Sequence, residues 1–128
     1  MLLNLIYNIF IGLIQPNSHH IQMENTISLE LAQEWAERWK NTQENGETPN
    51  FTAFLIPGID VLQALEPEEA VSVRTYLGID DTDMVKLMIV GVDSEGNDLI
   101  DESRGFYIYD FTSLCPPYCT KNPPFISQ

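Results

Sequence analysis

The chain has 128 residues, of which 44% are hydrophobic, a length that suits one compact domain and is too short for two. Its 19 acidic residues outnumber the 6 basic ones and give a formal net charge of -13. Such a chain is repelled by phosphate backbones and anionic headgroups, which excludes nucleic acid as an expected partner and disfavours a membrane surface. The same excess keeps a small protein in solution and leaves room for a basic protein partner.

The first 22 residues differ from the rest, because all 25 charged residues of the chain lie after them. Their apolar run, Leu2 to Ile14, is shorter than the ~20 residues of a membrane-spanning helix and lacks the basic start of a signal peptide. We therefore predict that residues 1–22 are a mis-called start, with translation beginning at Met23, or a non-core N-terminal extension. A membrane-tethered domain is the alternative if they are real. The only two histidines, His19 and His20, lie in this segment.

An amphipathic helix is predicted from Ser28 to Glu44. Serine is a favoured N-cap, and Leu31, Trp35 and Trp39 recur at helical spacing before Gly46 ends the helix. Two tryptophans on one stripe are typical of a face that packs on a sheet, although a ligand-stacking platform uses the same pattern. We interpret them as packing residues.

Four segments have the alternation or the β-branched and aromatic composition of strands: residues 51–56, 71–79, 85–92 and 106–111. The third, VKLMIVGV, is apolar on both faces and is expected to be the central strand. The polar turn at residues 80–83 predicts that it forms an antiparallel hairpin with the preceding strand. Asp60 is expected to cap a short helix, and Pro67 to begin another.

These elements predict an α+β domain over residues 23–111. Its core is an antiparallel sheet of about four strands, with the N-terminal amphipathic helix packed on one face. Residues 112–128 are predicted to be a proline-rich C-terminal tail, because four prolines interrupt regular structure over most of it.

The turn after the central strand resembles known sites only superficially. Gly91 and Gly96 have the spacing of a phosphate-binding loop, but Asn97 and Asp98 stand where lysine and serine or threonine are required. A calcium loop would need a glutamate where Arg104 stands. The sequence therefore predicts no catalytic residue and no bound cofactor.

The most distinctive motif is Cys115-Pro116-Pro117-Tyr118-Cys119. Its C-x3-C spacing is one residue longer than the thioredoxin-like motif. Two thiolates supply half of a tetrahedral zinc site, so zinc would have to be shared between copies. An extended chain would hold the two Cα atoms ~12 Å apart, whereas a turn would bring them within the ~6 Å of a disulfide. We regard Cys115 and Cys119 as candidate metal ligands, with a redox pair or a plain proline-stiffened tail as alternatives.

A resemblance rests on W-x3-W in the first helix, then AFLIP, VRTYLGID, KLMIVGVD and finally YDFTSLCPPYC. Over roughly Ile27 to Cys119 the chain resembles a group of small uncharacterised proteins of Bacteroidota-type bacteria. The resemblance implies neither an activity nor catalytic residues.

The sequence thus predicts a small acidic protein that is a non-catalytic protein-binding or self-associating module. Two cysteines are too few for a disulfide-built secreted scaffold, so we expect a cytoplasmic location. The expected partner is another protein or a second copy of the chain. The alternatives are a thiol or metal-binding protein that uses Cys115 and Cys119, and the membrane-tethered domain.

Overall fold

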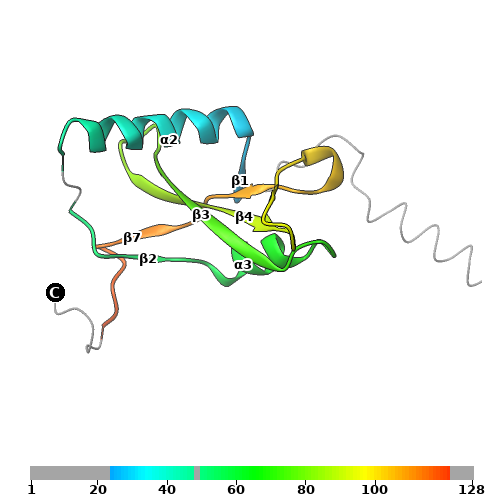
Figure 1. Cartoon of the computed structure of the whole chain (residues 1–128). Helices are drawn as coiled ribbons and strands as arrows, with labels where there is room; N and C mark the ends of the chain where they lie inside the picture. The colour runs from blue at the N-terminus through cyan, green and yellow to red at the C-terminus, as the bar shows by residue number, and fades with distance from the viewer. Residues whose placement is uncertain (1–23, 48–49, 122–128) are drawn as a thin grey trace, which may run out of the picture.

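The computed structural model describes residues 24–47 and 50–121, which form an α+β domain as predicted (Figure 1). The predicted extension at residues 1–22, the start at Met23 and the end of the predicted tail lie outside the described residues. In chain order the elements are β1 (Thr26–Ile27), α2 (Leu29–Glu44), β2 (Ala53–Leu55), α3 (Gly58–Leu65), β3 (Ser72–Ile79), β4 (Val85–Val92), β5 (Asp98–Leu99), the 3-10 helix η1 (Glu102–Arg104), β6 (Ile108–Tyr109) and β7 (Ser113–Cys115).

A five-stranded antiparallel sheet lies at the centre of the described domain. Its order is β1-β6-β4-β3, and β5 also pairs with β4. The predicted hairpin is confirmed, because β3 and β4 pair from Ser72 opposite Val92 to Ile79 opposite Val85. The central position of β4 is confirmed too, since Ile89 is 0% exposed.

The hairpin turn is organised by Asp80. Its carboxylate Oδ1 accepts hydrogen bonds from the backbone N–H groups of Thr82 and Met84 and from the Thr82 hydroxyl. Burial opposes ionisation of Asp80, but these hydrogen bonds together outweigh it and hold the pKa of Asp80 below its ordinary value. The Asp80 side chain thus stabilises the polar turn that the sequence predicts between the two strands.

The strand predicted at residues 51–56 forms, but its placement in the main sheet is wrong. β2 pairs with β7 in a separate two-stranded sheet, with Ala53 opposite Cys115 and Leu55 opposite Ser113. Just before β7, the Thr112 hydroxyl donates to the Leu87 carbonyl and accepts from the Leu87 N–H. The folded domain therefore continues beyond residue 111 into the segment that its prolines had assigned to a tail.

The helix α2 covers one face of the sheet (Figure 1). The Ser28 hydroxyl accepts the Leu31 N–H at 3.2 Å, which confirms the predicted N-cap. Trp35 is buried in a cluster that includes Met88 of β4, and the Trp39 ring lies 6.1 Å from that of Phe51. Both tryptophans pack within the domain, as the helical spacing predicted.

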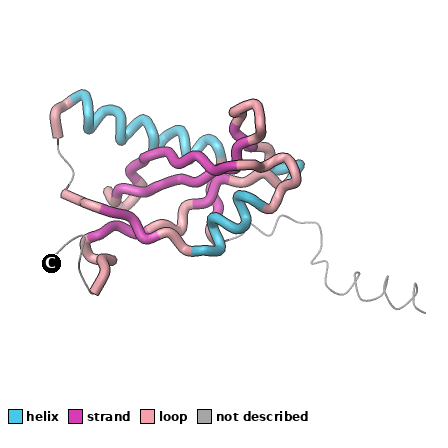
Figure 2. The backbone as a smooth tube through the Cα atoms, turned by 60° about the horizontal axis from the view of Figure 1, so that its bottom comes forward, coloured by secondary structure: helices cyan, strands magenta, loops and turns pink. Residues whose placement is uncertain are grey.

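The helix α3 covers the opposite face, where Ala64 packs with Ile89 of β4. Glycines allow both helices to approach the hairpin closely. A Cβ atom at Gly78 would lie only 2.8 Å from the Trp35 Cβ, and one at Gly91 would overlap the Ala64 carbonyl oxygen. The hairpin therefore lies between two helices, as Figure 2 shows.

A buried carboxylate holds α3 in place. Asp60, which is 0% exposed, accepts hydrogen bonds from the Asn25 side-chain amide at 2.7 Å and from the Phe111 N–H at 3.0 Å. The Asn25 amide also donates to the Gln63 side-chain oxygen at 2.8 Å. The prediction that Asp60 caps the helix is wrong, because α3 begins at Gly58 and Asp60 lies inside its first turn.

Asp110 is a second buried acid, and its side chain has fewer hydrogen bonds than that of Asp60. Its Oδ1 atom has no hydrogen-bond partner among the described residues. Burial raises the pKa of Asp110 above its ordinary value, and attraction to Lys86 only partly opposes this. The Lys86 ammonium itself donates to the backbone oxygens of Asp110 and Thr112. Folding therefore disfavours the ionised form of this carboxyl group.

We predict that Asp60→Ala lowers the free energy of unfolding by about 2–4 kcal/mol, because it leaves the Phe111 N–H and the Asn25 amide buried without their acceptor. Urea unfolding followed by circular dichroism measures the change. The matched control is Glu68→Ala, which removes an exposed acid from the loop after α3 and is expected to change stability by less than about 0.5 kcal/mol. Equal losses in both variants would contradict the anchoring role of Asp60.

We predict that Asp110→Asn stabilises the protein at pH 7 by about 1 kcal/mol, because an ionised carboxylate is costlier to bury than a neutral amide. An acid with a raised folded pKa contributes stability below its unfolded pKa and loses it as the pH rises through the folded pKa. The advantage of the variant should therefore shrink toward pH 4. Urea unfolding at several pH values measures it, and an advantage that does not depend on pH would refute this account of Asp110.

Candidate functional site

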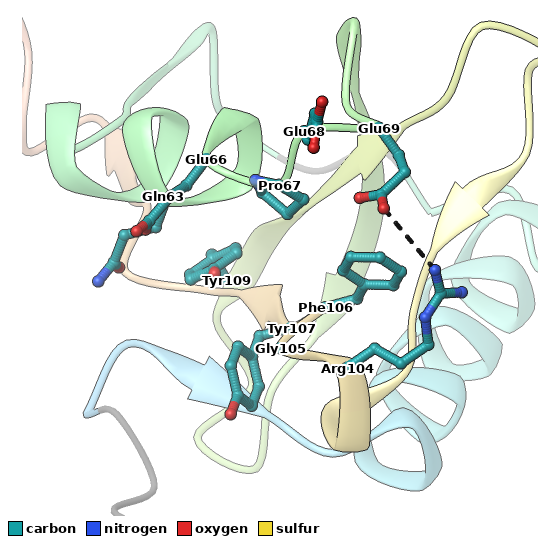
Figure 3. Close-up of a pocket in the computed structure, with 10 residues that line it drawn as sticks. All are labelled: Gln63, Glu66, Pro67, Glu68, Glu69, Arg104, Gly105, Phe106, Tyr107 and Tyr109. Carbon is teal, nitrogen blue, oxygen red and sulfur yellow. Dashed lines mark ion pairs between the residues drawn. The ribbon is translucent and has the colours of Figure 1, made fainter. Parts of the chain in front are cut away.

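Two segments far apart in the sequence enclose a pocket of about 500 Å³. One wall is the end of α3 with the loop that follows it, and the other is the segment that leads from η1 into β6 (Figure 3). We call it the acid–aromatic pocket, and its lining residues are Gln63, Glu66, Pro67, Glu68, Glu69, Arg104, Gly105, Phe106, Tyr107 and Tyr109.

The floor of the acid–aromatic pocket is aromatic. Phe106 and Tyr109 are buried, and the rings of Tyr107 and Tyr109 meet edge to face with their centres 6.4 Å apart. Burial, and then the charge of Glu66, raise the pKa of Tyr109 to about 12. The Tyr109 hydroxyl therefore stays protonated at neutral pH and can donate a hydrogen bond.

The rim is acidic. The loop turns where the Ala70 N–H donates to the Pro67 carbonyl at 2.9 Å, so the helix predicted to begin at Pro67 is wrong and the segment is a turn. Glu66 and Glu68 are exposed, and within the described part of the chain neither carboxylate has an ion-pair partner. These two carboxylates therefore remain available to a ligand.

One cation of the chain already lies in the acid–aromatic pocket. The guanidinium carbon of Arg104 is 4.5 Å from the centre of the Phe106 ring, and its Nη2 atom is 3.9 Å from Oε1 of Glu69 (Figure 3). Both charged side chains are more than half exposed, so the ion pair itself adds little stability. Its geometry shows that aromatic faces and carboxylates here accommodate a cation together.

This arrangement can bind a cation. Carboxylates and aromatic faces both attract positive charge, and the lining has several of each. Across the described residues, no group of three or more histidine, cysteine or acidic side chains is placed to hold a metal ion.

The predicted site residues lie elsewhere. Cys115 and Cys119 form a disulfide in a turn that holds their Cα atoms 4.7 Å apart, and the Tyr118 N–H donates to the Leu114 carbonyl across it. Sulfur atoms bonded to each other present no thiolate to zinc. The metal-ligand role therefore stays a prediction for the reduced protein only.

Sequence reasoning missed the acid–aromatic pocket. Its two halves are visible as the acidic run after Pro67 and the aromatic run that begins at Phe106, but nothing local indicates that they meet. The first predicts a helix start and the second predicts a strand. Only the packing of α3 across the sheet brings them together.

No helix in the described residues is long and apolar enough to cross a membrane, and the tether considered from the sequence lies outside them. No protein-family model, curated protein or solved structure matches the chain. The resemblance to the Bacteroidota-type group therefore stays a prediction, and the function is inferred from the site itself.

Proposed function

We propose that this protein is a non-catalytic protein-binding module whose partner inserts a cationic side chain into the acid–aromatic pocket. The observation that carries the proposal is the pair of unengaged carboxylates, Glu66 and Glu68, beside the aromatic floor on which Arg104 already stacks. A lysine or arginine of a partner would meet the same chemistry.

The physical terms favour such a ligand. A cation over an aromatic face gains roughly 0.5–2 kcal/mol, depending on how far it is desolvated. The pocket offers Tyr107 and Tyr109 in addition to the Phe106 ring that Arg104 covers. The net charge of -13 would steer a basic partner toward the protein before contact.

A different protein is a better partner than a second copy. Of the six basic residues, Arg38, Arg74 and Arg104 are in ion pairs, and Lys86 donates to backbone oxygens. A second copy thus has few cations to offer and carries the same negative charge. Of the two predicted modes of binding, self-association is therefore less favourable than binding to a different protein.

The predicted cytoplasmic location remains a proposal. The low cysteine count supports it, and the Cys115–Cys119 disulfide weighs against it because disulfides persist mainly in oxidising compartments. The thiol or metal-binding function requires the reduced form of these residues and is our second candidate for that form alone.

We predict that a peptide of alternating lysine and alanine shifts the ring signals of Phe106, Tyr107 and Tyr109 in NMR titrations. In the double variant Glu66→Gln/Glu68→Gln its affinity should fall about three- to tenfold, because two of the carboxylates that line the pocket are lost.

The control is Glu30→Gln/Glu37→Gln, which removes the same charge from the exposed face of α2. It should weaken binding far less. If both double variants weaken binding equally, the peptide responds to net charge alone and the proposal fails.

A further inference from the structure

We propose that the outer edge of β3 binds an extended, basic-flanked segment of the partner as an added strand. The inference rests on the proposed protein-binding function and names the class of segment that is bound. β3 ends the strand order of the main sheet, and among the described residues no strand pairs with its outer side (Figures 1 and 2).

The backbone of β3 presents hydrogen-bonding groups on this edge. Leu87 of β4 uses its N–H and carbonyl on Thr112, so both point away from β3. Directions alternate along an antiparallel ladder, so Met88 pairs toward β3, where its partner is Tyr76. Val73, Thr75 and Leu77 therefore direct their N–H and carbonyl groups outward.

One end of this edge is already closed. Arg38 of α2 donates to the Ile79 carbonyl and pairs with Asp81. The open edge is therefore the stretch from residue 73 to residue 77. Closing one end of an edge with a charged side chain is a common protection against aggregation.

The side chains beside the open edge are mostly apolar on one face. Val73 is opposite Gly91, which faces α3, so Val73, Thr75 and Leu77 lie on the α3 side of the sheet. Val71 is 62% exposed, and Leu62 on the outer side of α3 is 69% exposed. An added strand would cover the exposed valines with the side chains that it directs to this face.

Charge decides which strand fits. Glu68 and Glu69 precede β3, and Asp80, Asp81 and Asp83 follow it. A second copy paired antiparallel about Thr75 would bring the acids before β3 of one chain toward the acids after β3 of the other. Arg104 and Arg38 offset only Glu69 and Asp81, so two copies repel at both ends. An extended segment with apolar residues in its centre and lysine or arginine at both ends meets complementary charge instead.

The β3 edge and the acid–aromatic pocket are joined by the chain itself. Glu66 to Glu69, on the pocket rim, lead within a few residues into Ser72 at the start of β3. A basic residue at one end of the added strand would thus lie close to the pocket that accepts cations. One partner segment can therefore engage both surfaces.

The test uses the unaltered full chain and a synthetic peptide of about nine residues, enough to span the open edge, with alternating valine and threonine in the centre and lysines at both ends. Two versions carry backbone N-methyl groups, one on the odd and one on the even central residues. Because only alternate N–H groups of an added strand point at β3, one version should lose about tenfold or more in affinity and the other should bind as before. The amide signals of Val73, Thr75 and Leu77 should shift with the peptides that bind.

If both methylated versions bind as well as the parent, or both fail, strand addition is overturned. If binding is then lost only in the Glu66→Gln/Glu68→Gln variant, the pocket proposal stands and the strand-addition proposal does not. A peptide that binds neither surface would overturn both. Sedimentation that shows a dimer broken by Val73→Lys would assign the edge to a second copy and overturn the choice of partner.

Discussion

The Asp60 carboxylate is the interaction on which the rest of the structure depends. A buried carboxylate is tolerated only when donors replace its hydration, and here the donors come from Asn25 and Phe111, on opposite sides of α3 in the sequence. This fixes α3 against β1 and against the chain that leads into β7. With α3 fixed, Ala64 meets Gly91, and Glu66 lies beside the aromatic residues of the opposite pocket wall.

The length of α3 explains why apolar side chains of β3 stay exposed on the α3 face. A helix of 8 residues is ~12 Å long, whereas an 8-residue strand extends over ~27 Å. α3 can therefore cover the inner strand β4 near Ile89 but not the whole of β3. The long helix α2 protects the other face, where Arg74 and Tyr76 also hold Asp98 of β5. The α3 face of the hairpin is therefore only partly covered, whereas the long helix α2 protects the other face.

Features with a local cause could be predicted from the sequence. The Ser28 cap, the tryptophan stripe and the hairpin around Asp80 depend on residues within a few positions of each other. The pairing of β2 with β7 could not, because it joins segments about sixty residues apart and prolines near Cys115 masked the strand signal. Asp60 is predicted from the sequence to be a helix cap, because its distant donors leave no local signal. The acid–aromatic pocket also depends on the packing of α3. Its residues can be identified in the sequence, but the contact between its two walls cannot.

The acidic excess has a second consequence beyond solubility. An unpaired strand edge with exposed valines would recruit other copies of itself, and this sequence has no proline or bulge in the open stretch of β3 to prevent that. Carboxylates before and after the strand oppose pairing between identical chains, because each copy brings acids to both ends. The same carboxylates attract a basic segment. A single charge distribution can therefore keep the protein from associating with itself while leaving its edge available to a partner of opposite charge.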